Sequence, residues 1–210
     1  MNEKGINDIY NILRERIVGL YYKPGEPLNE RTLAREFQVS RTPVREAFIR
    51  LSSENLVTIV PHSGARVSDI NLRDLQNLIE LREILERGIG RLAAQNITEE
   101  QIHILEQLLK KASQVINGTI SEQIDYDMQF HKIIKQASQN HYLEEYLSIV
   151  QNQFFRIQRL ISHKPELIFT HLPQYLQVLK NRDTDRMGQL MVEHVEHFVE
   201  AVRRYFKISK

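Results

Sequence analysis

The sequence contains no cysteine, and among its 210 residues only eight are glycine and six are proline. The absence of cysteine excludes disulfides, thiolate nucleophiles, iron–sulfur clusters and cysteine-based zinc fingers. So few glycines and prolines leave little room for long loops and argue against a glycine-rich nucleotide-binding fold. No run approaches the roughly 18 apolar residues of a membrane span, so we expect no membrane-spanning segment. The net charge of +1 neither indicates nor excludes a nucleic-acid partner.

The remaining composition is that of a globular protein with a sizeable core. Hydrophobic residues make up 41% and charged residues 26% of the chain, and its length suits one large domain or two small ones. The first five residues are polar and lead into an amphipathic stretch, unlike the apolar core of a signal peptide. Together with the lack of cysteine, this predicts a cytoplasmic location.

Residues 1–70 predict a winged helix-turn-helix domain. Apolar residues recur at helical spacing from Ile6 to Leu20, and a Pro-Gly turn then ends the helix. Asn29 can cap a short second helix, and Ser40 or Thr42 can cap a third that runs to Asn55. The β-branched segment 57–60, a turn, and the segment 65–67 then predict a short hairpin.

Residues 71–210 show helical periodicity throughout, interrupted only by Pro165 and Pro173. A capping box at 98–101 opens one of the helices. We therefore predict a second domain that is an all-α antiparallel bundle of about six or seven helices, which makes the whole chain mainly α. The predicted helices start with an apolar stripe over 75–89 and continue over 98–117, 121–137, 141–161, 172–180 and 184–207.

The start of the third helix carries the residues best suited to reading DNA. Arg41 and Arg45 are four residues apart and therefore project from one helix face, where either can pair with guanine O6 and N7. The hydroxyls of Ser40 and Thr42, with the free N–H groups of the first turn, suit phosphate oxygens. Arg31, at the start of the preceding helix, can reach the same duplex.

The turn of the predicted hairpin supplies the wing. His62, Ser63 and Gly64 form a turn that fits the minor groove. The alternative for the helix arginines is a solvated face in which they pair with Glu30 and Glu46. The predicted DNA contacts are Arg31, Ser40, Arg41, Thr42, Arg45, His62, Ser63 and Gly64.

A second candidate site lies in the helical part. Asp127 and His131 are four residues apart and share a helix face, a spacing that can bind one divalent ion. His171, His194 and His197 lie on other predicted helices and could converge on the pair. The alternative is a hydrogen-bonded Asp–His pair without an ion. The remaining histidines of the helical part, His103, His141 and His163, are expected at the surface or at helix caps.

Two stretches of the first domain resemble the GntR superfamily of bacterial transcription regulators. These are residues 22–34, with the sequence YKPGEPLNERTLA, and residues 39–47, with the sequence VSRTPVREA. The segment 51–57 and the wing 64–67 fit the same pattern, with Asn55 where glycine is usual. The resemblance implies that Arg31, Arg41, Thr42, Arg45 and the wing near Gly64 contact DNA.

The segments 81–86, 127–140 and 183–194 resemble the FCD domain of the FadR-like subgroup. Many members of this subgroup hold a metal with an aspartate, the histidine four residues later and two further histidines. The resemblance therefore implies Asp127, His131 and His194 as ligands. The position expected for the remaining histidine falls on Leu172, whereas the histidine itself is His171, about 100° away around a helix.

The implied metal site is thus Asp127, His131, His171 and His194, with His197 as a substitute one turn beyond His194. A carboxylate with imidazoles suits zinc, which we expect, and also nickel, iron or manganese.

Arg82 lies in an otherwise apolar helical stretch, where a buried guanidinium needs a carboxylate partner. One alternative is a salt bridge to Glu86, four residues later. The resemblance implies a pocket for small carboxylate metabolites beside the metal, and Arg82 suits clamping such an effector.

These patterns favour a ligand-responsive transcription factor, which we expect to be a repressor. Its winged domain binds operator DNA, and its helical domain dimerises and senses a small carboxylate. Because one half-site gives few base contacts, a two-fold dimer on a palindrome is expected. One alternative is a constitutive DNA-binding dimer without effector or metal. The other is a metal-dependent enzyme. Against it, no convincing general base accompanies the candidate metal site, and an enzyme would have no use for a DNA-binding domain.

Overall fold

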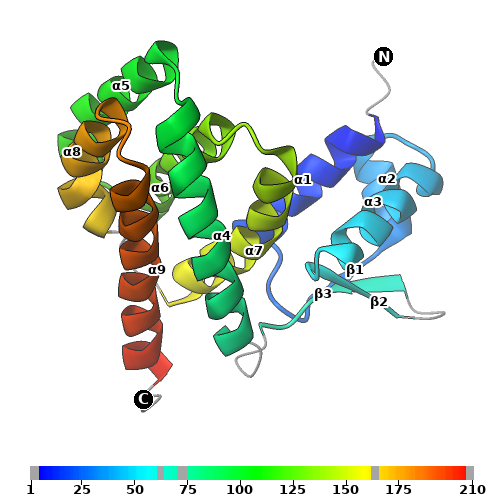
Figure 1. Cartoon of the computed structure of the whole chain (residues 1–210). Coiled ribbons are helices and arrows are strands. Elements are labelled where there is room, and N and C mark those ends of the chain that lie inside the picture. Colours follow the sequence, from blue (N-terminus) through cyan, green and yellow to red (C-terminus); the bar gives the residue numbers. More distant parts are fainter. Residues whose placement is uncertain (1–4, 61–63, 71–74, 162–165, 207–210) are drawn as a thin grey trace. The chain divides into compact units, whose positions relative to one another are not determined.

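The computed structural model describes residues 5–60, 64–70, 75–161 and 166–206, without the side chains of Ser113 and of residues 166–170. The chain divides into two compact units, Met1–Asn71 and Leu72–Lys210 (Figure 1). The elements of the first unit are α1 (Ile6–Val18), β1 (Pro27–Leu28), α2 (Glu30–Phe37), α3 (Arg41–Ser53), β2 (Val57–Val60) and β3 (Gly64–Val67). Those of the second are α4 (Leu75–Asn96), α5 (Glu99–Val115), α6 (Ile120–Ala137), α7 (His141–Leu160), α8 (Glu166–Lys180) and α9 (Thr184–Phe206).

The first unit is a winged helix-turn-helix, as predicted. Helices α1 and α3 pack together through buried apolar residues at helical spacing, and β2 and β3 pair antiparallel from Val57↔Val67 to Val60↔Gly64. Strand β1 pairs with the other side of β3 and gives the sheet order β1-β3-β2. This strand was not predicted from the sequence, because two residues at the end of a proline-rich turn are too few to show the alternating pattern of a strand.

Helix ends in this unit follow from side-chain capping and from left-handed residues. Asn29 Oδ1 accepts a hydrogen bond from the N–H of Thr32 at 3.0 Å and caps α2, as predicted. Helix α3 ends at Ser53, two residues before the predicted end, because Asn55 has a positive φ of 58°. Asparagine tolerates this conformation better than most residues, which explains why it can stand where relatives of this pattern have glycine.

The second unit is an all-α bundle, as predicted, and its core lies among its six described helices. The predicted capping box forms, since Thr98 Oγ1 accepts from the N–H of Gln101 while the Gln101 side chain accepts from the N–H of Thr98. An equivalent box at Thr119 and Glu122 opens α6. These caps fix where the helices of the bundle begin.

Helix α8 differs from the prediction. It begins at Glu166 instead of Leu172 and continues through Pro173. An interior proline removes one helical hydrogen bond and costs about 3 kcal/mol. The helix nevertheless continues, because residues on both sides of Pro173 bury apolar side chains in the core, including Leu172, Tyr175 and Leu179.

Helices α4 and α9 lie side by side at very short range (Figure 1, green and orange to red). A Cβ atom on Gly90 would lie 2.7 Å from Met191 Cγ and 2.9 Å from the carbonyl oxygen of Met187. A Cβ on Gly188 would lie 3.1 Å from the carbonyl oxygen of Arg87. The two glycines therefore let the backbones approach, and this crossing fixes α9 relative to the polar residues of α4.

Candidate functional site

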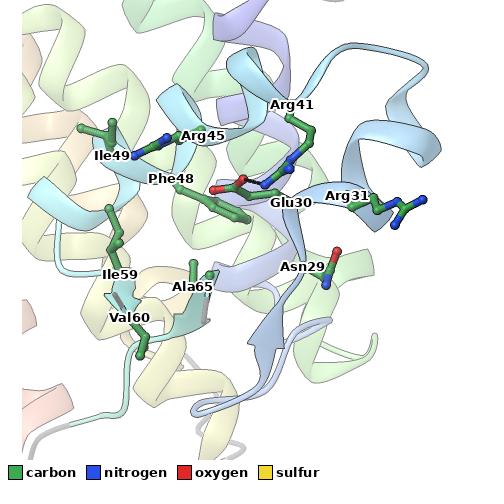
Figure 2. Close-up of a pocket in the computed structure, with 11 residues that line it drawn as sticks. Asn29, Glu30, Arg31, Arg41, Arg45, Phe48, Ile49, Ile59, Val60 and Ala65 are labelled. Atoms are coloured by element: carbon green, nitrogen blue, oxygen red, sulfur yellow. Dashed lines mark hydrogen bonds and ion pairs between the residues drawn. The ribbon is translucent and has the colours of Figure 1, made fainter. Parts of the chain in front are cut away.

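The first candidate site is a hollow of about 600 Å³ within the winged unit, between α2, α3 and the sheet (Figure 2). Three arginines among its lining residues, Arg31, Arg41 and Arg45, are exposed. Phe48, which also lines it, is almost fully buried, whereas the lining residues Ile49 and Ile59 are about half exposed. The hollow therefore combines exposed positive charge with apolar surface, a combination suited to contacts with phosphates and base edges.

The arginines of the recognition helix α3 differ in their surroundings. Arg41 Nη2 lies 2.9 Å from Glu30 Oε2, which agrees with the paired alternative for this residue (Figure 2). Arg45 forms no ion pair with any residue that the structure describes. An exposed pair of this kind contributes only about 0–1 kcal/mol, so Arg41 can exchange Glu30 for DNA.

The predicted phosphate-binding residues lie at the helix start. Ser40 occupies the N-cap of α3, but its hydroxyl makes no capping hydrogen bond, and both Ser40 and Thr42 are exposed. Gly64 opens β3 with a positive φ of 96°, a conformation that other residues rarely adopt. The remaining predicted wing residues, His62 and Ser63, lie outside the described residues.

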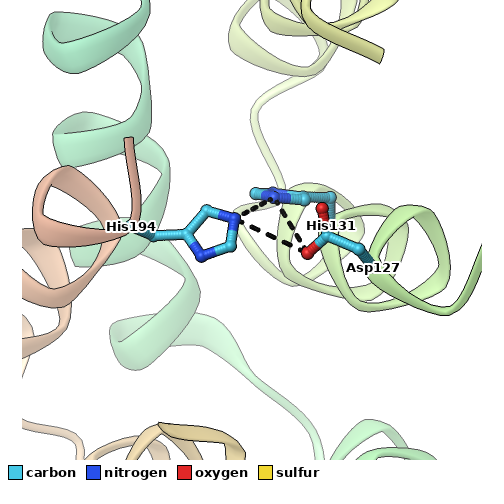
Figure 3. A group of neighbouring side chains, drawn as sticks. All are labelled: Asp127, His131 and His194. Carbon is cyan, nitrogen blue, oxygen red and sulfur yellow. Dashed lines mark hydrogen bonds and ion pairs between the residues drawn. The ribbon is translucent and has the colours of Figure 1, made fainter. Parts of the chain in front are cut away.

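The second candidate site is a buried group of three side chains in the helical unit (Figure 3). Asp127 and His131 project from α6 and His194 from α9. The Nε2 atoms of the two histidines are 3.2 Å apart, and Asp127 Oδ1 lies 3.5 Å from His194 Nε2 and 3.8 Å from His131 Nε2. One atom from each residue thus points toward a common centre.

This group fits a divalent ion. Two ligands about 2.0–2.1 Å from a tetrahedral zinc are about 3.3–3.4 Å apart, close to the three observed separations. Asp127 Oδ1 is buried and has no hydrogen-bond partner among the described residues, which is costly for a carboxylate oxygen without a cation. One carboxylate with two imidazoles is also a donor set that zinc, nickel, iron and manganese accept.

Burial controls the protonation of the group. It raises the pKa of Asp127 to about 7, against the opposing charge of Arg82 and with a smaller increase from Glu86. Burial also holds the pKa of His131 well below its ordinary value, and the neighbouring His194 and Arg82 add to this effect. The His131 imidazole is therefore neutral near pH 7, as a metal ligand must be.

Arg82 lies next to this group and is itself buried, with 3% exposure. Its Nε donates to Glu86 Oε1 at 3.1 Å, so the salt-bridge alternative for Arg82 holds. The guanidinium also stacks over the ring of Phe154, 4.5 Å from its centroid. Its charge acts on Asp127 and His131, since it lowers the pKa of both groups.

Gln151 on α7 is a polar neighbour that sequence reasoning missed. Its Nε2 lies 2.9 Å from Glu86 Oε1 and 3.0 Å from His131 Nδ1, and the side chain is buried. A signal was present in the sequence, because Gln151 occupies a buried helical position in register with Leu147 and Phe154. A glutamine on such an apolar stripe points to a polar partner inside the core.

The structure does not bring the other predicted ligands to the centre. Among the described residues, the metal-compatible group contains neither His171 nor His197. Helix α8 passes Pro173 without a break, and Leu172 is the fully buried residue while His171 is only half-buried. One residue is about 100° of rotation, so His171 points elsewhere than the inward position.

Taken together, a winged helix-turn-helix and an arginine-lined hollow beside its third helix are the features of a DNA-binding protein. The chain belongs to the GntR family of bacterial regulatory proteins, since the model of that family matches residues 6–67 and the model of the FCD domain matches residues 77–197. It is a DNA-binding regulator of transcription and not an enzyme. Among the described residues, none of the helices combines the length and low charge of a membrane span.

Characterised relatives support this membership. The HTH-type transcriptional repressor RspR of Escherichia coli is 31% identical over 200 residues, which cover 93% of this chain and 88% of that protein. The Nta operon transcriptional regulator of Aminobacter aminovorans is 34% identical over 193 residues, covering 86% and 87% of the two chains. The solved structure of Escherichia coli McbR/YncC has a TM-score of 0.82 and 25% identity, covering 96% of this chain and 98% of that one.

Proposed function

We propose that the protein is a ligand-responsive, sequence-specific repressor in the cytoplasm, in which residues 1–70 bind the operator and residues 71–210 dimerise and sense a small carboxylate. The observation that carries this proposal is the buried group of Asp127, His131 and His194 beside Arg82, in a chain whose other unit binds DNA. The similarity to RspR, a repressor, supports repression.

Operator recognition is assigned to the recognition helix and the wing. Arg45, which is exposed and has no ion-pair partner in the described structure, pairs with a guanine in the major groove, and Arg41 exchanges Glu30 for a second base edge. Ser40 and Thr42 bind phosphates at the start of α3, Arg31 binds the backbone from α2, and the wing at His62, Ser63 and Gly64 enters the minor groove.

Selection of binding sites from random duplexes tests this assignment. Two-fold symmetric sites with a guanine in each half are expected. Enrichment of asymmetric sites, or no enrichment over random DNA, would contradict sequence-specific binding by a dimer.

The dimer is assigned to exposed apolar side chains on α4 and α7. On α4 these are Leu81 and Ile84, the latter 70% exposed. On α7, Tyr142 and Tyr146 are 71% and 59% exposed and flank Leu143, which lies next to Gly88 of α4. A second copy of the chain is the occupant that a palindromic operator requires, and aromatic residues are enriched at such interfaces.

The metal site is assigned to Asp127, His131 and His194, with zinc as the expected ion. These three residues would hold the ion, which would supply positive charge for binding a carboxylate. Because only three side chains of the described structure would hold the ion, no fourth histidine has to leave before a carboxylate binds. His171 and His197 are therefore not required for the site.

Arg82 supplies the charge complement for the effector. Its Nε is engaged with Glu86, and no residue that the structure describes hydrogen-bonds to its two terminal amino groups. These groups form a fork that matches a carboxylate. Arg82 and the residues that would hold the metal would thus bind a small carboxylic acid together, in a buried site where ionic interactions are strong.

The effector changes operator affinity by favouring one arrangement of the two winged units over another. A coupling of about 1–3 kcal/mol is typical of allosteric proteins. The test is a titration of operator DNA with zinc-loaded and chelator-treated protein in the presence of mono-, di- and tricarboxylic acids. A response to at least one acid that requires zinc is expected. No response to any acid in either form would contradict carboxylate sensing.

A constitutive DNA-binding dimer is the second candidate. It is favoured by the direct contact between His131 Nε2 and His194 Nε2 and by the Arg82–Glu86 pair, which give these buried groups partners without an ion or effector. In that case the protein would retain no metal after purification in metal-containing buffer, and its operator affinity would not depend on chelator.

A further inference from the structure

The second ring nitrogen of His131, Nδ1, has buried partners of its own, separate from those of Nε2. Gln151 Nε2 lies 3.0 Å from His131 Nδ1 and 2.9 Å from Glu86 Oε1. Glu86 Oε1 in turn accepts from Arg82 Nε at 3.1 Å. All four side chains are buried, so these contacts form without competition from bulk water.

The donors and acceptors of this arrangement determine the tautomer of His131. An amide nitrogen only donates, so His131 Nδ1 accepts from Gln151 and carries no proton. The proton of the neutral ring is then on Nε2, which donates to His194 Nε2 at 3.2 Å. In this tautomer, Nε2 of His131 is blocked by its own proton and cannot bind a metal.

We propose that Gln151 is a positioning residue whose side-chain amide turns by half a rotation when the metal binds. This inference rests on the metal site proposed above. A metal on His131 Nε2 places the ring proton on Nδ1, which then needs an acceptor. Gln151 Oε1 is buried and has no hydrogen-bond partner among the described residues, and the half-turn brings it to His131 Nδ1.

The same turn links the metal to the arginine that binds the effector. When Gln151 presents its oxygen to His131, that oxygen takes the place of Nε2, 2.9 Å from Glu86 Oε1. Two acceptors repel at this distance, so the Glu86 carboxylate must turn away from Gln151. Glu86 then depends on Arg82 for its hydrogen bond, so occupancy of the metal site changes the surroundings of the Arg82–Glu86 pair. Glu86 cannot take over the role of Gln151 without moving, because its Oε1 is 3.7 Å from His131 Nδ1.

Nitrogen NMR of the histidine-labelled wild-type chain tests the tautomer directly. The metal-free protein is expected to carry the His131 proton on Nε2, and the zinc-loaded protein is expected to carry it on Nδ1. A metal-free protein with the proton already on Nδ1, or zinc bound through Nδ1, would overturn the inference. This measurement requires no variant and therefore does not depend on how a substitution folds.

Zinc affinity of Gln151→Leu, measured by competition with a chelator, tests the positioning role. Loss of the acceptor for His131 Nδ1–H is expected to weaken zinc binding about 10–100-fold. Gln158→Leu is the matched control, because Gln158 is another buried glutamine of α7. It is expected to bind zinc like the wild type.

The outcomes separate the two levels of the proposal. Unchanged or stronger zinc binding by Gln151→Leu would overturn the role of Gln151 and leave the metal site intact. Equal weakening in the Gln158→Leu control would overturn it as well, because the loss would then be general to α7. Failure of the wild-type protein to bind zinc would instead overturn the proposed metal site itself.

Discussion

The crossing of α4 and α9 at Gly90 provides a quantitative test of how the helical unit is built. A Cβ added at this position by Gly90→Ala meets Met191 Cγ at 2.7 Å, the Met187 carbonyl oxygen at 2.9 Å and Gly188 Cα at 3.2 Å. Met191 can rotate away, but the two backbone atoms can move only if the helices separate. Overpacking of this kind costs about 1–3 kcal/mol.

Alanine also stabilises a helix by about 1 kcal/mol relative to glycine, which offsets part of this cost. Because backbone atoms cause the clash at Gly90, we expect a cost in the upper part of this range, about 2–3 kcal/mol, and hence a net loss of about 1–2 kcal/mol in the free energy of unfolding. At about 2–4 °C per kcal/mol for a domain of this size, thermal denaturation should show a Tm lower by about 2–8 °C. Separation of the helices also moves His194 relative to Asp127, so zinc binding should weaken.

Gly88→Ala is the matched control on the same helix. Its Cβ would lie 3.7 Å from Leu143 Cδ1, an ordinary van der Waals contact. This variant should gain the helix-propensity term and unfold at the wild-type temperature or above it. If Gly90→Ala were as stable as Gly88→Ala, the close approach of α4 and α9 would be refuted.

Three further predictions concern the two sites and the dimer. Arg45→Ala should weaken operator binding by about 1–3 kcal/mol per half-site and relax the preference at one base. Arg41→Ala should weaken it by up to about 1 kcal/mol less, because Arg41 must first leave Glu30. Equal weakening by Arg45→Ala on all sequences would make Arg45 a phosphate contact. The folded-state pKa of Asp127 is about 7, above its ordinary value of 3.8. In the presence of chelator, the wild-type protein should therefore gain stability relative to Asp127→Asn as the pH falls from about 7 toward 4. Denaturant titrations that show no such trend would contradict the raised pKa. Ile84→Asp should dissociate the dimer in sedimentation, whereas Asp at Ile104, an exposed residue of α5, should not; a dimeric Ile84→Asp protein would place the interface elsewhere.

Much of the fold could be predicted from the sequence because local signals and burial agree. Helical periodicity, the cap at Asn29 and the box at Thr98 mark elements whose ends are decided within a few residues. Strand β1 could not be predicted in this way, because its pairing with β3 is a contact between distant segments. The predicted start of α8 at Leu172 was wrong for a related reason. Burial of the neighbours of Pro173 in the core outweighs the local helix-breaking effect of the proline.

The candidate metal site was predictable only in part. The spacing of Asp127 and His131 places both on one face of α6 from local geometry alone. The resemblance also implied His194, which lies with them in the structure. That His171 does not join them depends on the rotation of α8 about its axis, which the packing of the whole bundle sets. The role of Gln151 needed atomic distances, because its type and spacing do not reveal which end of its amide faces His131.

In the proposed function, the Asp–His group of the helical unit, and not the winged unit, binds the effector. The most direct measurement is the operator affinity of wild-type protein and of a variant with both His131→Ala and His194→Ala, each with zinc and the panel of carboxylic acids. The wild-type affinity is expected to change about 5–150-fold with an effective acid, as a coupling of about 1–3 kcal/mol requires. The double variant is expected to retain no zinc, to bind operator as tightly as the effector-free wild-type protein and not to respond. A double variant that still responds to the same acid would contradict effector sensing by the Asp–His group.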